Sequence, residues 1–360
     1  MSNGSLTYID YIKFFKSKKI ISKNFNKNQV QPSSIDLTLS NECFQISSSF
    51  LSPTSYLQNK IQKFLIKKIS LDYGYIFKKN KTYLVKLNES LNLPKSVFGK
   101  CNPKSSTGRL DIFCRTIFNY SNEYEKIPQG YKGDVFLEIT SRAFDVKLHS
   151  GDSLNQMRLV IKKKKLINDS RLLSYHKKNP IIFYDSKKNI QSYISSGLKI
   201  SVDLNNKNSI VAYKAKNNCP VLLFNKIKTH KISDFWKPIK KNNDSLTIFP
   251  GEFYILKSKE KIKIPRFLAA EMIPYDTAIG DFRAHYAGFF DPGFGSNKGS
   301  YAVLEVRTSE VPFTLEDGQI IATLIFEKLN KNPKISYGPE INSNYQNQEL
   351  ALSKHFKVIE

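Results

Sequence analysis

The segment 83–95 reads Tyr83-Leu-Val-Lys-Leu-Asn-Glu-Ser-Leu-Asn-Leu-Pro-Lys95, and it recurs 171 residues later as Tyr254-Ile-Leu-Lys-Ser-Lys-Glu-Lys-Ile-Lys-Ile-Pro-Arg266. Each copy contains two strand-like runs around a polar turn and ends in proline followed by a basic residue. Self-similarity at a fixed offset indicates a tandem repeat. Because both copies continue as short strands separated by turn signals, with few helical patterns, we predict a mainly β protein built of barrels or sandwiches.

A second landmark of each copy is a glycine-rich turn that leads into a strand with one acid. In the first copy the turn contains Gly130 and Gly133 and the strand carries Glu138, whereas in the second the turn is Asp291-Pro-Gly-Phe-Gly295 and the strand carries Glu305. A carboxyl group in an apolar strand must find a partner or its pKa rises. A raised pKa suits a group that shuttles protons. A solvated residue on an outward face is the alternative for each glutamate.

Between two apolar runs lies Pro103-Lys-Ser-Ser-Thr-Gly-Arg109, which concentrates hydroxyls, backbone donors and two cations. Ser105 and Ser106 offer O–H donors, and the planar guanidinium of Arg109 suits phosphate oxygens. The segment is therefore typical of an anion cradle, and an ordinary solvated turn is the alternative.

The two copies lack complementary parts. The second copy has Asp276, Thr277 and Gly280 where the first has the two serines and the arginine of the cradle, and the first copy has Pro128 opposite Asp291. We therefore predict a composite site, with the cradle from the first copy and the acids from the second.

The N-terminal region and the composition add three expectations. Residues 5–21 have helical apolar spacing with Ser5 as N-cap, which predicts a short N-terminal helix. Asp36, the one charge of the extended segment 31–39, is expected to be structural. The 56 Lys and Arg against 31 Asp and Glu give a net charge of +25, which alone favours a polyanionic partner. Because only eight of these cations are arginines, we interpret the excess mainly as compositional bias and expect no nucleic-acid partner.

Cysteine and histidine usage predicts a zinc-free protein in a reducing compartment. The four cysteines lack C-x-x-C spacing and the five histidines are scattered, so neither a disulfide framework nor a zinc site is indicated. No apolar run reaches membrane-spanning length and the N-terminus has no signal-peptide pattern, so we expect a cytoplasmic protein without a membrane partner.

Four motifs resemble those of one family. They are Lys104-Ser-Ser-Thr-Gly-Arg109, Phe289-Phe-Asp-Pro-Gly-Phe-Gly295, Val303-Leu-Glu-Val306 and Gln31-Pro-Ser-Ser-Ile-Asp-Leu37. In a duplicated frame they are similar to motifs of the dCTP deaminase family within the trimeric dUTPase superfamily, and most similar to its long, duplicated bacterial form. Tyr337 and the run Asn344-Tyr-Gln-Asn-Gln348 resemble the closing tail of that family, with Asn344 and Gln346 at positions of basic residues.

The resemblance implies a fold and a division of the chain. It implies two tandem dUTPase-like β-barrel domains of β-clip or jelly-roll type. The first deaminase-like repeat is expected at 1–170, a connector at 171–205, the second repeat at 206–335 and the closing tail at 336–360. The resemblance also implies a homo-oligomer of trimeric type.

The activity implied by the resemblance is zinc-independent hydrolysis of dCTP to dUTP and ammonia, which supplies dUTP for thymidylate synthesis. Mg²⁺ is expected to arrive with the triphosphate rather than in a protein cage, and feedback inhibition by dTTP stays open. Two alternatives also stay open: a dUTPase or bifunctional dCTP deaminase and dUTP diphosphatase in the same fold, and a nucleic-acid-binding β-barrel protein.

The implied site residues fall into two groups. The catalytic group is Ser105, Arg109, Glu305 and Glu138, with Glu305 as general acid and base and Glu138 as a relic or structural residue in the composite site. Asp291 is expected to accept a hydrogen bond from the deoxyribose 3′-hydroxyl, with Phe294 beneath the sugar. The substrate-binding group as a whole is Lys104, Ser106, Asp291, Phe294, Ala287, Tyr337, Tyr345 and Gln348.

Overall fold

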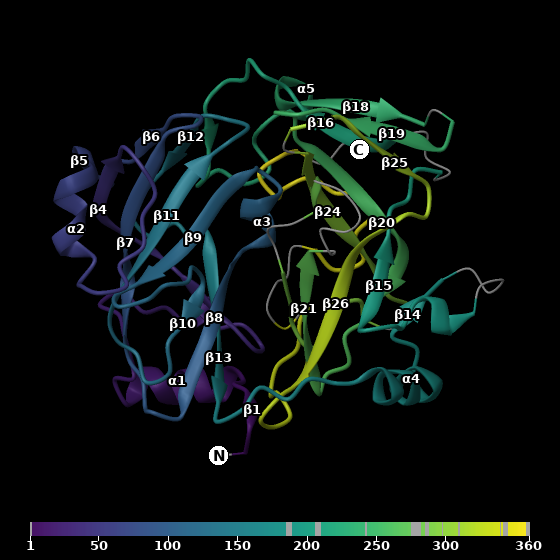
Figure 1. Ribbon diagram of the computed structural model, residues 1–360, viewed down its shortest axis with the longest axis horizontal. Helices are drawn as coiled ribbons and strands as arrows, with labels where there is room; N and C mark the ends of the chain where they lie inside the picture. The colour runs from purple at the N-terminus through teal and green to yellow at the C-terminus, as the bar shows by residue number, and fades with distance from the viewer. Residues whose placement is uncertain are drawn as a thin grey trace.

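The computed structural model describes residues 2–184, 189–205, 210–241, 243–274, 282–284, 288–296, 298–308, 310–338, 340 and 345–357. The described residues are mainly in β-strands, which confirms the predicted class. Figure 1 shows the strands of the first copy, in purple and blue, beside those of the second copy, in green and yellow. The short helix α3 (Ser105–Gly108), which holds the cradle, lies where the two sets of strands meet (Figure 1).

Two sheets belong to the first copy. One has the strand order β1-β13-β8-β10, with β3 paired to β13, and the other has the order β5-β4-β7-β11-β9, with β2 paired to β7. The strands are β1 (Gly4–Ser5), β2 (Ile20–Ile21), β3 (Ile35–Leu37), β4 (Leu39–Ile46), β5 (Leu65–Ser70), β7 (Thr82–Asn92), β8 (Val97–Pro103), β9 (Ile112–Phe118), β10 (Lys126–Ile127), β11 (Lys132–Ser141) and β13 (Asn155–Ile161).

The second copy has two corresponding sheets. Their orders are β15-β26-β21-β23 and β18-β16-β20-β24-β22, with β14 paired to β20. The strands are β14 (Ile182–Phe183), β15 (Leu198–Ser201), β16 (Ile210–Ala215), β18 (Trp236–Lys240), β20 (Tyr254–Ile262), β21 (Leu268–Pro274), β22 (Phe282–Ala284), β23 (Phe289–Phe290), β24 (Ser300–Thr308) and β26 (Ile320–Lys328).

Smaller elements complete the chain. A mixed sheet β17-β12-β6 joins the two copies and a two-stranded sheet pairs β19 with β25. These strands are β6 (Tyr75–Phe77), β12 (Val146–Leu148), β17 (Leu222–Leu223), β19 (Ser245–Ile248) and β25 (Phe313–Glu316). The remaining helices are α1 (Tyr8–Lys16), α2 (Gln58–Phe64), α4 (Asp169–Lys178), α5 (Ile232–Phe235) and the 3-10 turns η1 (Lys27–Gln29) and η2 (Ile190–Ser192).

Each repeated segment forms one continuous central strand, β7 or β20, so the expected polar turn between two strand-like runs was wrong. β7 pairs with β11 so that Leu84 lies opposite Glu138, and β20 pairs with β24 so that Ile255 lies opposite Glu305. Positions 84 and 255 differ by the same 171 residues as the sequence repeat. Both glutamates therefore occupy the same place in their sheets, and their different surroundings must come from other elements.

The sheets are open, so the closed-barrel description is wrong for the described residues. Each strand order has two ends, and several edge strands, such as β1, β2 and β10, are only two residues long. A closed barrel requires continuous pairing around the ring with a regular stagger. Edge strands of two residues cannot supply this pairing. The boundaries expected for the repeats, connector and tail stay a prediction.

The N-terminal helix is shorter than expected. Ser5 belongs to β1, where it pairs with Val160, and α1 begins after Thr7, whose backbone N–H donates to the carboxylate of Asp10. The helix ends before Lys18, which has a φ of 52° and breaks the helical hydrogen bonding. The predicted N-cap and the predicted start were wrong because the capping bond of Asp10 stabilises a later start. The predicted end at residue 21 was wrong because the helix already ends before Lys18.

Two large apolar cores lie under the sheets. The first contains most buried side chains of the first copy and also takes in Phe235, Trp236 and Phe356, whereas the second is built from residues between Ile167 and Phe326. Apolar contacts thus tie the later part of the chain to the first copy. Among the residues that the structure describes, no helix is long and apolar enough to cross a membrane, and a cytoplasmic location stays a prediction.

Candidate active site

The cradle is one helical turn at the end of a strand. β8 ends at Pro103, and the backbone N–H groups of Thr107 and Gly108 donate to the carbonyl of Lys104, which closes the turn α3. Gly108 lies against the second copy, because a Cβ atom at this position would overlap the carboxyl group of Glu305. Glycine is therefore required here for close approach rather than for an unusual φ.

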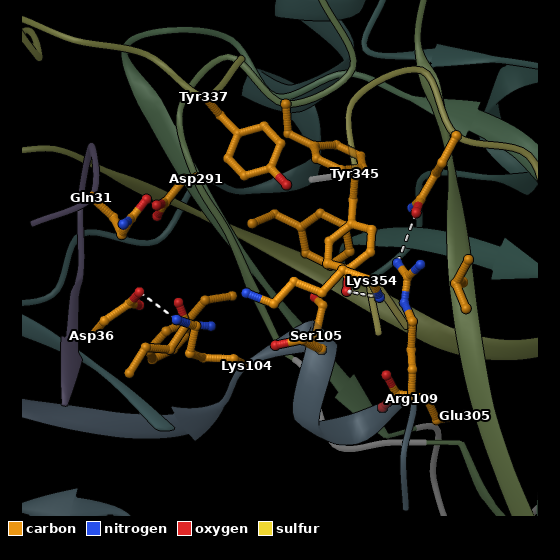
Figure 2. A pocket seen from close by; sticks show the side chains of 17 residues that line it. Gln31, Asp36, Lys104, Ser105, Arg109, Asp291, Glu305, Tyr337, Tyr345 and Lys354 are labelled. Carbon is orange, nitrogen blue, oxygen red and sulfur yellow. Dashed lines mark hydrogen bonds and ion pairs between the residues drawn. The ribbon is translucent and has the colours of Figure 1, made fainter. Parts of the chain in front are cut away.

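Side chains of both copies line one pocket. Glu305 comes from β24 of the second copy, is only 3% exposed, and packs directly on the cradle of the first copy. Figure 2 shows Glu305 and Arg109 at one end of a pocket and Asp36 and Lys104 at the other. The pocket is lined by Gln31, Asp36, Lys104, Ser105, Ser106, Arg109, Gln156, Phe289, Phe290, Asp291, Phe294, Val303, Glu305, Tyr337, Tyr345, Gln348 and Lys354.

Arg109 is held by the C-terminal segment. Its guanidinium donates to the side-chain oxygen of Gln348 at 2.7 Å and to the carbonyl of Ala351 at 3.0 Å, and it stacks on the ring of Tyr345 at 3.9 Å. Burial lowers the pKa of Arg109, and nearby groups, Glu305 among them, oppose this shift. The C-terminal segment therefore covers the guanidinium of Arg109, which is the group of the cradle that could bind an anionic ligand.

Asp291 lies on the opposite wall, at the start of the glycine-rich turn. One carboxylate oxygen, Oδ1, accepts from the hydroxyl of Ser33 at 2.7 Å and from Arg158 at 2.9 Å. The other, Oδ2, accepts a longer bond of 3.3 Å from Ser34. Oδ2 therefore keeps acceptor capacity for a hydroxyl that enters the pocket.

Aromatic side chains surround this carboxylate. Phe294 is nearly fully buried and contacts Phe290 edge-to-face at 5.0 Å and Tyr337 at 5.6 Å between ring centroids. Burial raises the pKa of Tyr337, so its hydroxyl stays protonated and available as a donor. This wall offers an apolar surface next to one hydrogen-bond acceptor, which is how a site selects a ligand by shape and by one polar group.

The far end of the pocket is cationic and was only partly foreseen. Lys104 forms an ion pair with Asp36, and burial raises the pKa of Asp36 while Lys104 opposes that shift. Figure 2 shows the ammonium group of Lys354 directed into the same space. Burial lowers the pKa of Lys354, and the charge of Lys104 acts in the same direction. Two ammonium groups near one another favour an anionic ligand between them.

Most of the sequence-predicted residues meet in this pocket. Glu138 lies outside it: the carboxylate is 2% exposed and accepts from Arg115 at 2.6 Å and from Ser49. Ala287 lies outside the described residues, as do Asp276, Thr277 and Gly280.

The sequence interpretation missed several lining residues. They are Gln31, Asp36, Gln156, Phe289, Phe290, Val303 and Lys354. The motif at 31–37 held a usable signal, because Asp36 follows the two serines that contact Asp291. Lys354 belongs to no motif, so only the folded chain shows that it faces the pocket.

The tail is anchored beyond the pocket by a buried histidine. His355 is fully buried, its Nδ1 lies 2.9 Å from the Ser353 hydroxyl, and its ring packs on Phe224. The backbone N–H groups of Thr229 and His230 donate to the carbonyl of His355. Residues 353–357 thus dock on the segment after β17.

We expect this anchor to weaken in acid. Burial lowers the pKa of His355 to about 3, with the charge of Lys354 acting in the same direction, against an ordinary value of about 6.5. The unfolded tail therefore binds a proton first, so the stabilisation is complete above pH 6.5 and falls as the pH drops toward 3. At pH 5 the loss is about 2 kcal/mol. Hydrogen exchange at the amides of Thr229 and His230, corrected for intrinsic rates, measures it.

The control for this prediction is His355→Phe, because His355 Nε2 has no hydrogen-bond partner among the described residues. Phenylalanine fills similar space and cannot titrate. Exchange at the two amides should lose most of its pH dependence in this variant. An equal acid effect in both proteins would assign the change to another group.

Comparisons with known proteins agree with this geometry. Residues 2–163 match the family model of the 2′-deoxycytidine 5′-triphosphate deaminase N-terminal domain, and residues 168–356 match that of the C-terminal domain. The chain belongs to the 2′-deoxycytidine 5′-triphosphate deaminase family, which confirms the resemblance.

Among the described residues no group of three or more His, Cys, Asp or Glu side chains could hold a metal ion.

Individual relatives extend this result. A crystal structure of 2′-deoxycytidine 5′-triphosphate deaminase from Agrobacterium tumefaciens is 37% identical, covers 93% of this chain and 100% of its own, and superposes with a TM-score of 0.87. Relatives named "dCTP deaminase, dUMP-forming" from Halobacterium salinarum and a Hydrogenobaculum species are 30% and 27% identical, over 31% and 42% of this chain. The matched stretches span 56% and 77% of those two relatives.

Proposed function

We propose that the chain is a dCTP deaminase that replaces the 4-amino group of the cytosine base with oxygen from water. The observation that carries the proposal is the contact of the Glu305 carboxyl with Gly108, beside the guanidinium of Arg109. This contact places the buried carboxyl of Glu305, which can carry a proton, next to the hydroxyl and guanidinium donors of the cradle. The proposal is supported by the family membership and by the printed names of the relatives.

The reaction assigns one role to each group. As the water oxygen adds to C4, Glu305 takes a proton from the water and passes it to the amino nitrogen, after which the C4–N bond breaks and ammonia leaves. Arg109 and Ser105 hold the water and the base by charge-assisted and hydroxyl hydrogen bonds. The sum is dCTP plus water giving dUTP plus ammonia, and no other reactant is needed.

The sugar and the phosphates occupy the other parts of the pocket. Asp291 accepts from the 3′-hydroxyl through Oδ2, with Phe294 against the sugar ring. Lys104, Ser106 and Lys354 line the triphosphate end. At this end the carboxylate of Asp36 is paired with Lys104, so Mg²⁺ would be held by phosphate oxygens and water rather than by a protein cage. When bound, the ion neutralises phosphate charge.

The product is the point at which two candidates differ. Several relatives carry the name "dUMP-forming", which favours a bifunctional enzyme that also splits the phosphate chain. Such a step needs a carboxylate to activate water at the phosphates, and the engagement of Asp36 with Lys104 favours release of intact dUTP. The proposed product is therefore dUTP. A trimeric homo-oligomer and inhibition by dTTP are further parts of the proposal.

Incubation with dCTP, CTP or dUTP in the presence of Mg²⁺, followed by ion-exchange separation and an ammonia assay, tests the proposal. We expect one ammonia per dCTP consumed, dUTP as product and no turnover of dUTP. The value of kcat/KM should be about 10²-fold lower for CTP, because a 2′-hydroxyl has no partner against the aromatic wall.

Three outcomes would change these assignments. Pyrophosphate and dUMP from dCTP would favour the bifunctional enzyme. Turnover of dUTP without ammonia release from dCTP would favour a dUTPase. DNA binding with steep salt dependence and no nucleotide turnover would favour the binding protein.

A further inference from the structure

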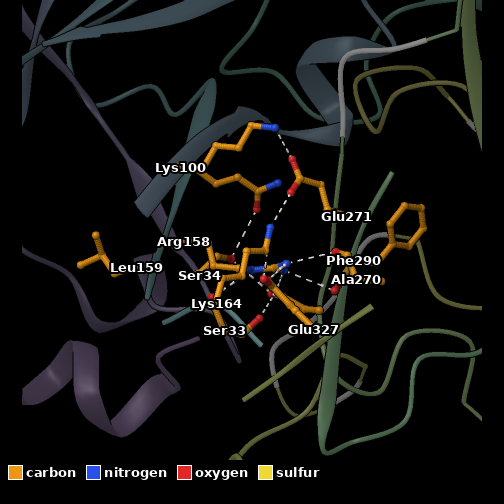
Figure 3. A network of polar contacts seen from close by, with 12 residues as sticks. Ser33, Ser34, Lys100, Arg158, Leu159, Lys164, Ala270, Glu271, Phe290 and Glu327 are labelled. Carbon is orange, nitrogen blue, oxygen red and sulfur yellow. Dashed lines mark hydrogen bonds and ion pairs between the residues drawn. The ribbon is translucent and has the colours of Figure 1, made fainter. Parts of the chain in front are cut away.

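A charge network with a buried centre lies directly behind the pocket, between the two copies. Its centre is Arg158 on β13, which is 2% exposed and uses all five of its N–H donors (Figure 3). The acceptors are the carbonyls of Ser33 at 3.3 Å, Ala270 at 3.0 Å and Phe290 at 3.3 Å, Glu327 at 3.0 Å and Asp291 at 2.9 Å. A guanidinium with every donor engaged has one allowed position and orientation.

The network separates charge between the copies. The cations Lys100, Arg158 and Lys164 come from the first copy, and the acids Glu271, Asp291 and Glu327 come from the second. Three charges of each sign balance, so the network is neutral as a whole. Burial alone would lower the pKa of Arg158, but Glu327 and Asp291 raise it above its ordinary value, so the guanidinium stays charged.

Arg158 contacts three consecutive residues of the pocket wall. Its guanidinium stacks on the ring of Phe289 at 4.2 Å, donates to the carbonyl of Phe290, and donates to Oδ1 of Asp291. Phe289, Phe290 and Asp291 all line the pocket. The place of the Asp291 carboxylate therefore depends on an arginine that does not line the pocket itself.

We propose that Arg158 is a positioning residue for recognition of the sugar 3′-hydroxyl: it binds Oδ1 of Asp291 and so directs Oδ2 toward the 3′-hydroxyl of a bound deoxynucleotide. This inference rests on the proposed function. Ser33 supports the same arrangement, because its hydroxyl donates to the same Oδ1 at 2.7 Å. Without Arg158 the carboxylate would lose its charged partner and its fixed rotamer, and discrimination between sugars would fall.

The test compares Arg158→Lys with Glu327→Gln by steady-state kinetics on dCTP and on 2′,3′-dideoxy-CTP, which lacks the 3′-hydroxyl. Lysine keeps the charge and loses the planar fork, so we expect KM for dCTP to rise at least tenfold, kcat to change less than threefold, and the preference for dCTP over the dideoxy substrate to fall at least tenfold. Glu327 contacts Arg158 and Lys164 but not Asp291. Glu327→Gln should lower the melting temperature while the preference stays within threefold of the wild type.

A double-mutant cycle separates positioning from general stability. In the Asp291→Asn background, Arg158→Lys should change the preference by less than twofold, because its effect acts through that carboxylate. If Arg158→Lys does not fold, Ser33→Ala takes its place, with an expected three- to tenfold loss of preference. An unchanged preference in the single variant, or losses that add in the double variant, overturns the inference. No dCTP turnover by the wild type would instead overturn the proposed function and the inference with it.

Discussion

Arg109→Ala is expected to reduce kcat/KM for dCTP by a factor of about 30 to 1000 while the protein stays folded. The reason is the loss of a charge-assisted contact in a water-excluded site, which costs roughly 2–4 kcal/mol in the transition state. The guanidinium is 3% exposed and already arranged by Tyr345 and Gln348. Arg109→Lys should restore little of the rate, because a point charge cannot reproduce two planar donors. Steady-state kinetics with circular dichroism as the folding check measures both variants.

The chain contains a matched control for this substitution. Arg115 also stacks on a tyrosine, Tyr124, at 3.7 Å and also lies next to a buried glutamate, Glu138. It is not among the residues that line the pocket. Arg115→Ala should therefore cost stability and leave kcat/KM within about threefold. Near-normal kinetics for Arg109→Ala would remove the cradle from the mechanism.

Glu305→Gln is expected to abolish deamination, with a loss of about 10²–10⁴-fold in kcat, because glutamine keeps the shape of the side chain but cannot carry the proton. The carboxyl of Glu305 lies against the cradle. In the proposed function this is where the cytosine base and the attacking water meet. KM should change much less than kcat, since the sugar and phosphate contacts belong to other residues. Single-turnover rates across a pH series, compared with the wild type, show whether the proton-transfer step is lost.

Glu138→Gln is the control at the equivalent position of the first copy. Glu138 is opposite Leu84 just as Glu305 is opposite Ile255, but its carboxylate is bound by Arg115 and Ser49. We expect normal kcat and a lower melting temperature, because removing one partner of a buried ion pair is destabilising. Loss of activity in Glu138→Gln alone would contradict the composite site, and equal losses would give both glutamates a role.

The strand content was predictable because alternating burial leaves a period-two pattern in the sequence. In β7 the buried Val85, Leu87 and Leu91 alternate with polar residues. The openness of the sheets was not predictable, because it depends on edge pairings such as β1 with β13, each made by two residues. Two residues carry no periodic signal.

The residues of the candidate site were predictable where they belong to a recognisable sequence motif. The cradle, the Asp291 turn and the glutamate strand could be recognised because each has a distinctive local composition, and the structure brings them to one pocket. Glu138 and Glu305 lie in similar apolar strands, so in the sequence only the complementary losses of the two copies distinguished their roles. The difference arises from the strand opposite, where β9 places Arg115 next to Glu138. Asp36 looked structural because its partner Lys104 is 68 residues away.

The docking of residues 353–357 has a consequence for ligand competition. Gln348 and Ala351, which occupy the guanidinium of Arg109, are only a few residues from the docked segment. A tethered group acts at an effective concentration set by the length of its tether, about millimolar for a short one. A nucleotide that uses the same two N–H groups of Arg109 therefore competes with intramolecular acceptors whose effective concentration is the same at every protein concentration. Dilution of the enzyme cannot relieve this competition, whereas a longer segment between the docked residues and Gln348 would.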